Sequence, residues 1–381
     1  MTWRQSFVFA REIEFGKGHN TSEMLGLWYQ PPPGSKFSYT YSREGQNLVQ
    51  TGQRTWKEMA YGKVSGSWQW SFPLDYDYIE PFLFCFDNYT FVTEEGITGY
   101  HTFSRTEEGF TPSFTVRVKT LNKAVGGFGD MFEDLVGCVV TSFKLGSTAG
   151  SSQIMVSLGG IFTDMSQGTE GFATGTLGGL DYVHRPNNAV MYSCLYIGDT
   201  AVADVVSASV QSKNSVSLIY SVLNPIARSR FEASTSNMFS CAIFSKEPSI
   251  LRQRVYTGGY STDRATRWTK LAPIPEVTLR SIAEDGHELR IIAEDVVVRS
   301  MGMRDDGQVL YDVLDSTECR ALTLTVTNKI PYQYTLCMNS AGKYNTAVQG
   351  NYRPILIETA PGDITSHATG HFTSSESYLT E

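Results

Sequence analysis

The chain has 381 residues and a formal net charge of −8, with 18% charged and 12% aromatic residues. Its length allows two or three domains, each large enough to bury a core of its own. The acidic balance argues against a protein that binds nucleic acid tightly through phosphate contacts. The many aromatic residues favour an all-β protein over a helical enzyme.

Six cysteines are scattered along the chain without a Cys-x-x-Cys pair. The sequence therefore predicts neither a zinc site nor a disulfide framework, and it favours a reducing compartment. Arg and Glu interrupt the apolar run at the N-terminus, which is not typical of a signal peptide or an anchor. No stretch approaches the roughly 20 apolar residues of a membrane helix, so we expect no membrane partner and assembly in a cytoplasm.

Residues 17–35 carry an apolar group that runs into three consecutive prolines, a pattern that favours an extended polyproline conformation. Such a segment is too apolar to be left in water and usually marks a partner site. We therefore predict an arm that contacts a neighbouring molecule. Its candidate contact residues are Leu25, Leu27, Trp28, Tyr29, Pro31, Pro32 and Pro33.

Period-two alternation of apolar and polar residues dominates the rest of the chain and predicts half-buried strands. In residues 36–42 (KFSYTYS), aromatic side chains alternate with Ser and Thr. Turn signals such as Lys213-Asn214 are expected to separate consecutive strands. Strands are predicted at residues 36–42, 63–72, 113–119, 136–145, 153–158, 205–211, 215–221, 276–281, 289–300 and 320–328.

Helix content is expected to be small. Residues 74–86 (LDYDYIEPFLFCF) are predicted to form a short helix interrupted at Pro81. Residues 247–255 (EPSILRQRV) have a proline at an early helical position, where its missing N–H costs nothing. We interpret each segment as a single short α-helix.

The order of these elements repeats along the chain. Each half contains a strand hairpin, a helix candidate and then three strands, which indicates two β-units joined by the small residues of 171–179 (GFATGTLGG). We expect a first unit over 1–178, a second over 179–330, and a C-terminal extension over 331–381. The Ser/Thr-rich end of that extension is typical of a loosely held tail.

Catalytic signatures are largely missing. The chain contains no GxSxG, HExxH, GxxxxGK[ST] or kinase motif. The glycines of residues 126–132 lack the preceding strand and following helix of a phosphate loop, so we interpret them as a flexible loop. His367 and His371 are four apart, but they lie in a tail without helical pattern or partner carboxylates. We predict no metal and no cofactor.

Two groups of residues have an alternative interpretation as a sugar site. Asp75, Asp77 and Glu80 could supply the paired carboxylates of a glycosidase, but we favour their placement on the solvent side of the short helix. Trp68 and Trp70 could form a sugar-stacking platform. Both lie on the apolar side of a regular alternation, so we favour the core or an interface.

Residues 51–86 and 134–162 together resemble the major tail tube proteins of long-tailed, siphovirus-like bacteriophages. In that family a glycine-containing strand leads through a proline into a short helix, and a later strand is followed by a Gly-rich turn and an alternating strand. The similarity continues more faintly through residues 268–328. The matching positions here are Gly62, Gly66, Pro73, Gly137, Val139, Leu145, Gly146 and Gly159.

The resemblance implies a mainly β chain with two tandem tail-tube-type β-sandwich units, each with one short flanking α-helix. Such units join edge to edge into a ring-forming β-barrel around a channel, and rings stack into a tube. The expected role is a structural virion protein, not an enzyme, that forms a conduit for genome delivery. The 17–35 arm would bridge neighbouring rings. This arm and the C-terminal tail depart from the family pattern.

The resemblance also implies the partners. The chain is expected to bind itself in a ring, which is usually a hexamer in the family. Because the repeated element order indicates two units per chain, we favour a trimeric, pseudo-six-fold ring, with the hexamer as the alternative. Tape measure, tail terminator and distal tail proteins are further expected partners, and DNA passes transiently. The protein would reside in the virion after assembly in the host cytoplasm.

A conduit for a polyanion should present few cations that would retain phosphates. Polar strand faces are therefore the predicted lining of the channel. The candidates are Ser65, Ser67, Gln69, Gln153, Ser157, Thr323 and Thr325.

Two other functions stay open at this point. One is a carbohydrate-binding or carbohydrate-degrading β-protein of a phage tail. The lack of a clear pair of catalytic carboxylates argues against it. The other is a different tail component, such as a distal tail or tail completion protein.

Overall fold

The structure is a computed structural model, and the statements below concern the residues that it describes. These are residues 4–12, 14–18, 27–29, 31–32, 34–48, 58–76, 80–94, 98–106, 109–121, 131–147, 153–168, 190–198, 200–221, 224–244, 273–283, 287–305, 310–328, 332–338, 344–350 and 356–357.

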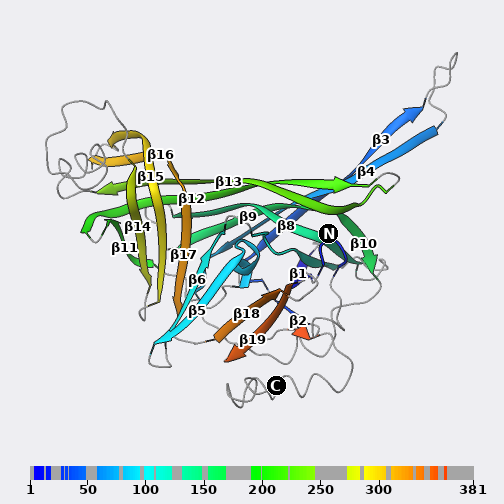
Figure 1. The fold of residues 1–381 in the computed structure, drawn as a ribbon, viewed down its shortest axis with the longest axis horizontal. Helices are drawn as coiled ribbons and strands as arrows, with labels where there is room; N and C mark the ends of the chain where they lie inside the picture. The colour runs from blue at the N-terminus through cyan, green and yellow to red at the C-terminus, as the bar shows by residue number, and fades with distance from the viewer. Residues whose placement is uncertain are drawn as a thin grey trace.

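The described chain is mainly β, as predicted, and its strands pair antiparallel (Figure 1). Most of them belong to one 16-stranded sheet, beside two small sheets, β18–β19 and β2–β20. The strands are β1 (Arg4–Arg11), β2 (Leu27–Trp28), β3 (Lys36–Leu48), β4 (Glu58–Pro73), β5 (Asn88–Glu94), β6 (Thr98–Ser104), β7 (Phe114–Leu121), β8 (Met131–Ser147), β9 (Ile154–Phe162), β10 (Asp164–Gly168), β11 (Val190–Ile197), β12 (Thr200–Tyr220), β13 (Ala227–Phe244), β14 (Ile274–Ala283), β15 (Glu288–Asp305), β16 (Leu310–Cys319), β17 (Ala321–Asn328), β18 (Tyr332–Met338), β19 (Tyr344–Gly350) and β20 (Leu356–Ile357).

The alternation read from the sequence sets which side of each strand is buried. In β4, Trp68 and Trp70 are each 1% exposed, while the alternating residues Ser67 and Gln69 are exposed. Because successive side chains of a strand point to opposite faces, one face of β4 packs inward and the other stays polar. The two tryptophans therefore belong to the core, one of the two locations predicted for them.

One predicted turn is wrong. Lys213-Asn214 lies inside the continuous strand β12, where Asn214 pairs with Thr235 of β13. The Asn214 side chain is buried, and its amide donates to the Glu232 carboxylate over 2.6 Å. Asparagine favours turns when its side chain forms a hydrogen bond with nearby backbone. Here the Asn214 side chain instead forms its hydrogen bond with a residue of the neighbouring strand β13.

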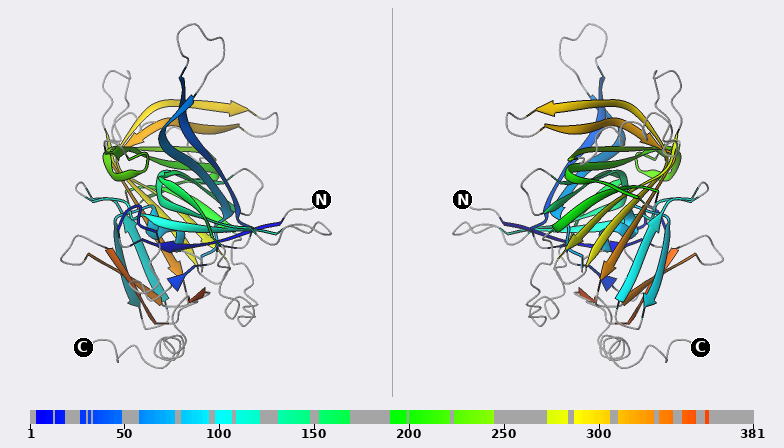
Figure 2. Two further views of the ribbon diagram at one scale, coloured as in Figure 1. Left: turned by 90° about the vertical axis from the view of Figure 1, so that its right-hand side faces the viewer. Right: turned by 90° about the vertical axis from the view of Figure 1, so that its left-hand side faces the viewer.

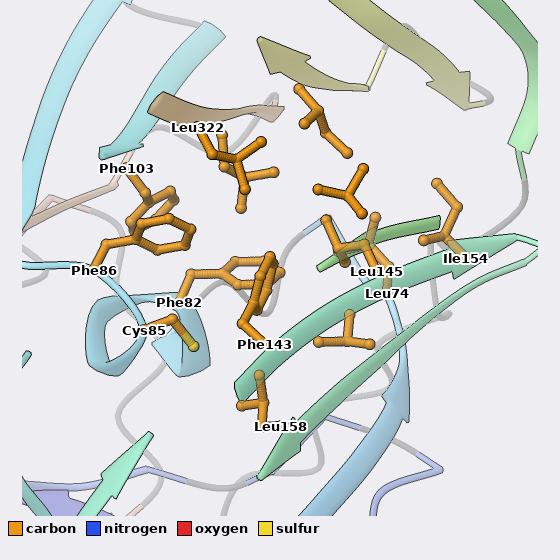
Figure 3. Close-up of a cluster of buried hydrophobic side chains, with 14 of the residues drawn as sticks. Leu74, Phe82, Cys85, Phe86, Phe103, Phe143, Leu145, Ile154, Leu158 and Leu322 are labelled. Carbon is orange, nitrogen blue, oxygen red and sulfur yellow. The ribbon is translucent and has the colours of Figure 1, made fainter. Parts of the chain in front are cut away.

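The sheet encloses a single hydrophobic core. The long strands β8, β9 and β12 form one side, and β14, β15, β17 and β6 cross them on the other (Figures 1 and 2). Phe82 lies between these layers, with its ring centroid 5.7 Å from that of Phe103 in β6 and 5.9 Å from that of Phe143 in β8 (Figure 3). Burial of several large aromatic rings at about 25 cal/mol per Å² is the main force that holds the layers together.

The predicted α-helix at 74–86 is wrong. The segment instead contains the 3-10 helix η1 (Glu80–Phe84), and all five of its residues are buried. A surface helix needs a polar stripe, but the consecutive apolar residues Phe82, Leu83 and Phe84 all enter the core. No α-helix occurs in the described part of the chain. The second helix candidate, residues 247–255, lies outside the described residues.

Asp75 and Glu80 are also corrected. Both were expected on the solvent side of the helix, yet their side chains are 1% and 2% exposed. Asp75 precedes η1 and Glu80 begins it, and every described residue from 74 to 86 is buried. Asp77 lies outside the described residues.

Strand pairing crosses the expected boundary at residue 178. Strand β8 pairs with β12, and β6 pairs with β17. Strands on both sides of the 171–179 segment therefore belong to one sheet, and that boundary does not separate two sheets.

Candidate functional site

A polar face lies on the side of the long strands that points away from the core. It crosses β13, β12, β8, β9, β4 and β3, and we name it the polar face. One row of paired residues runs through Met238, Gln211, Lys144, Ser157, Ser71 and Lys36. The next row runs through Ser236, Lys213, Ser142, Gly159, Gln69 and Ser38.

Four of the predicted lumen residues lie on this face. Ser67, Gln69 and Ser157 are exposed, and Ser65 is half-buried, with its hydroxyl 3.3 Å from that of Ser42 on β3. They come together because β4 pairs with β9 in a register that places Ser71 opposite Ser157. Gln153, directly before β9, is exposed as well.

Lysines interrupt the polar face without forming a continuous lining. Lys36, Lys144 and Lys213 are exposed, and Ser, Gln and Gly lie between them in the paired rows. The acidity of the whole chain is therefore not concentrated in these two rows.

Thr323 and Thr325 lie elsewhere. Both are half-buried residues of β17, where Thr325 pairs with Arg290 and with Thr102. Leu324 between them is buried in the core that β8 and β9 also enclose. These two threonines thus belong to the opposite layer of the molecule and do not extend the polar face.

The edges of β3 and of the second half of β15 are among those that are unpaired in the described part of the chain. Strand β3 pairs with β4 on one side only. The second half of β15, from Val297 to Asp305, pairs with β16 but has no strand on its other side, because β14 reaches only to Val296. Unpaired edges expose backbone donors and acceptors and offer sites for another strand.

The predicted contact arm is partly buried within its own chain. Tyr29 is 3% exposed, its ring stacks on Phe9, and its backbone exchanges hydrogen bonds of 2.8 and 3.0 Å with that residue. Pro32 is buried and Pro31 half-buried. Burial and the charge of Glu80 raise the pKa of Tyr29. In this conformation Tyr29 and Pro32 do not offer a contact surface.

The structure says less about the other predicted contact residues of the arm. Leu27 and Trp28 form strand β2, which pairs with β20. Leu25 and Pro33 lie outside the described residues. The bridging of neighbouring rings stays a prediction.

A buried carboxylate fixes the bend of β8. Glu12 accepts hydrogen bonds from the Gly137 N–H at 2.7 Å, the Thr115 hydroxyl at 2.9 Å and the Gly16 N–H at 3.0 Å. Gly137 has a positive φ of 69°, which glycine adopts without strain. Burial is the largest influence on Glu12 and raises its pKa, against the effect of these donors. The cluster is structural, because its donors are already satisfied by one carboxylate.

A second cluster attaches the β12–β13 hairpin to the 109–113 segment. The Thr111 hydroxyl donates to the Glu232 carboxylate and lies 2.9 Å from both of its oxygens, and Glu232 pairs with Arg230 at 3.0 Å. Arg105 beside it donates to the Cys85 carbonyl oxygen, and desolvation lowers the pKa of Arg105. Sequence reasoning missed this cluster, since its members come from distant strands without a local motif.

Among the described residues, no group of three or more His, Cys, Asp or Glu side chains could hold a metal ion. Asp75 and Glu80 are too buried to face a sugar. No helix of the described residues is long and apolar enough to cross a membrane. His367, His371 and most of residues 126–132 lie outside the described part of the chain.

Comparison with known proteins assigns no family. No protein-family model matches the chain, and no curated protein is significantly similar to it.

Proposed function

We propose that this chain is a structural tail tube protein of a tailed phage, which assembles through its strand edges into rings that stack as a conduit for DNA. The observation that carries the proposal is the combination of a polar, strand-built face with edges on β3 and on the second half of β15 that are unpaired among the described residues. An edge-to-edge ring would remove these edges, which are otherwise an aggregation hazard.

The proposal includes two tandem units of the same topology. Support comes from strand pairing, which follows one series in each half of the chain. The pairs β1–β7, β7–β8, β8–β10, β8–β9, β9–β4 and β4–β3 have the counterparts β11–β14, β14–β15, β15–β17, β15–β16, β16–β13 and β13–β12.

Local irregularities support the same duplication. The β3–β4 pairing shifts register between Arg43 and Gly45, and the β12–β13 pairing shifts between Asn214 and Val216. If β4 is aligned with β13 so that Trp68 matches Phe239, their partner strands β3 and β12 are aligned as well. The two register shifts then fall at the same point.

Similar bends in β8 and β15 support the proposed equivalence as well. Gly137 has φ 69° and Asp295 has φ 51°, the one non-glycine positive φ among the described residues. Beside the first bend, the Thr163 N–H donates to the Val136 carbonyl oxygen. Beside the second, the Arg320 N–H donates to Glu294 in the same way, at the same 2.9 Å. Residue identities differ, which is why the duplication is faint in the sequence.

Two units per chain favour a trimeric ring with pseudo-six-fold symmetry. The polar face would line the channel, and Ser67, Gln69 and Ser157 would point toward the DNA. The layer with Thr323 and Thr325 would then face away from the channel, so we no longer propose these two residues for the lumen.

Negative-stain microscopy of the purified chain, with native mass spectrometry of the smallest closed species, tests the proposal. We expect rings or tubes with three chains per ring. A chain that stays a discrete monomer at every concentration contradicts the tube function. Rings of six chains contradict the two-unit proposal and leave the tube function intact.

A further inference from the structure

The contact that joins the two halves of the chain provides a template for the contact between chains. Strand β8 pairs with β12 over a register that places Lys144 opposite Gln211. If the two units of the proposed function are equivalent, β15 corresponds to β8 and β3 corresponds to β12. The unpaired half of β15 and the unpaired edge of β3 are then the two halves of one repeated contact.

We propose that β15 of one chain pairs antiparallel with β3 of the next copy, in the register that β8 and β12 adopt within the chain. This inference rests on the proposed two-unit function and goes beyond it by naming the paired residues. The paired residues are Ser300 with Ser42, Met301 with Tyr41, Gly302 with Thr40, Met303 with Tyr39, Arg304 with Ser38, and Asp305 with Phe37 of the next copy.

The exposure of β3 supports this occupant. Val210 and Ser212 of β12 are each 1% exposed, and β8 covers that edge. Their equivalents on β3 are Tyr39, which is half-buried, and Tyr41, which is 36% exposed. Two aromatic rings on an open edge are the feature expected where a covering strand is missing from an isolated chain.

The position of the two edges supports a repeated, head-to-tail contact. Strand β3 lies at one end of the series β3, β4, β9, β8, β12, β13, β16 and β15, and β15 lies at the other. Figure 1 shows these strands at opposite ends of the longest axis. A heterologous contact of this kind closes into a ring when its rotation is a whole fraction of a turn.

Engineered cysteines test the register directly. Opposite residues of antiparallel strands have Cα atoms about 4.5 or 5.5 Å apart, within the range that a disulfide spans. Gly302→Cys fits sterically, because a Cβ at Gly302 would meet no atom within 4 Å. Thr40→Cys replaces an exposed residue, and the described native cysteines are buried.

The experiment mixes Gly302→Cys protein with Thr40→Cys protein under mild oxidation and measures covalent dimer on a non-reducing gel. We expect a dimer band at least about tenfold stronger than that from Gly302→Cys mixed with Lys36→Cys, a position about 13 Å further along the strand. The double variant Lys144→Cys/Gln211→Cys is the matched positive control for the register, because its disulfide would form within one chain and is read as the loss of two free thiols after oxidation.

The outcomes separate the inference from the proposed function. Tubes without the Gly302–Thr40 cross-link, or with equal cross-linking to Lys36→Cys, overturn the register and leave the tube function standing. Cross-linked rings that never stack support the register and count against the tube. A chain that remains monomeric and uncross-linked at every concentration overturns both.

Discussion

The Tyr220 hydroxyl donates a hydrogen bond of 2.9 Å to the carbonyl oxygen of Val64, which joins the tip of the β12–β13 hairpin to β4. The Val64 N–H donates to the Pro225 carbonyl oxygen, also at 2.9 Å. Lys63 lies 5.2 Å from the centroid of the Tyr220 ring. The β12–β13 hairpin is thereby held near the point where β4 begins to pair with β9 and the β3–β4 hairpin leaves the body (Figure 1).

Tyr220→Phe is expected to lower the free energy of unfolding by about 1 kcal/mol, the usual contribution of one hydrogen bond. Urea unfolding at pH 7 measures it. Ser217→Ala, an exposed position on the same strand, is the control and should change stability by less than about 0.5 kcal/mol. Equal effects of the two substitutions would show that the Tyr220–Val64 hydrogen bond contributes nothing to the free energy of unfolding.

The two bends differ in how much they tolerate substitution. Gly137→Ala should destabilise the chain by about 3 kcal/mol, because it adds a side chain at positive φ and places its Cβ 2.4 Å from the Thr163 hydroxyl oxygen. Asp295→Gly removes a strained φ and an exposed ion pair with Arg320, so its net effect should stay within about 1 kcal/mol. Thermal unfolding of both variants checks this, and a large loss for Asp295→Gly would be evidence against the equivalence.

Removal of the Glu232 carboxylate should cost far more than removal of a surface carboxylate. Glu232→Ala removes the ion-pair partner of Arg230 and an acceptor of Thr111 and Asn214 in a buried cluster, and a loss of about 3–5 kcal/mol is expected. Glu318→Ala breaks an ion pair with Arg299 in which both side chains are about half exposed, and it should cost less than about 1 kcal/mol. Denaturant unfolding compares them; similar losses would refute the structural role of the cluster.

Stability should fall at alkaline pH. Burial raises the pKa of Cys319 from 9.0 to about 11, and burial with the adjacent Glu133 raises the pKa of Tyr39. These groups stay neutral in the fold but ionise in the unfolded chain, so their contribution is complete below about pH 8.5 and is lost as the pH rises through their folded-state pKa values. Unfolding measured from pH 7 to 11 should show a decline that begins near pH 9. A flat profile would contradict it.

Much of the strand content follows from local sequence, because alternation decides which face of a strand can be buried. Residues 36–42 and 63–72 fall within β3 and β4, and both predicted tryptophans lie in the core. The polar residues Ser67, Gln69 and Ser157 are on an exposed face as their spacing indicated. The length, the net charge and the absence of catalytic sequence motifs also follow from the sequence alone.

Only the tertiary structure decided how these strands are combined. Which strands pair, as in β8 with β12, depends on contacts between residues far apart in the chain, and alternation is the same for any partner. The burial of Asp75 and Glu80 likewise depends on the layers that surround η1. Thr323 and Ser67 both alternate with apolar residues, yet they lie on opposite layers, since a sequence pattern defines the two faces of a strand but not the layer to which the strand belongs.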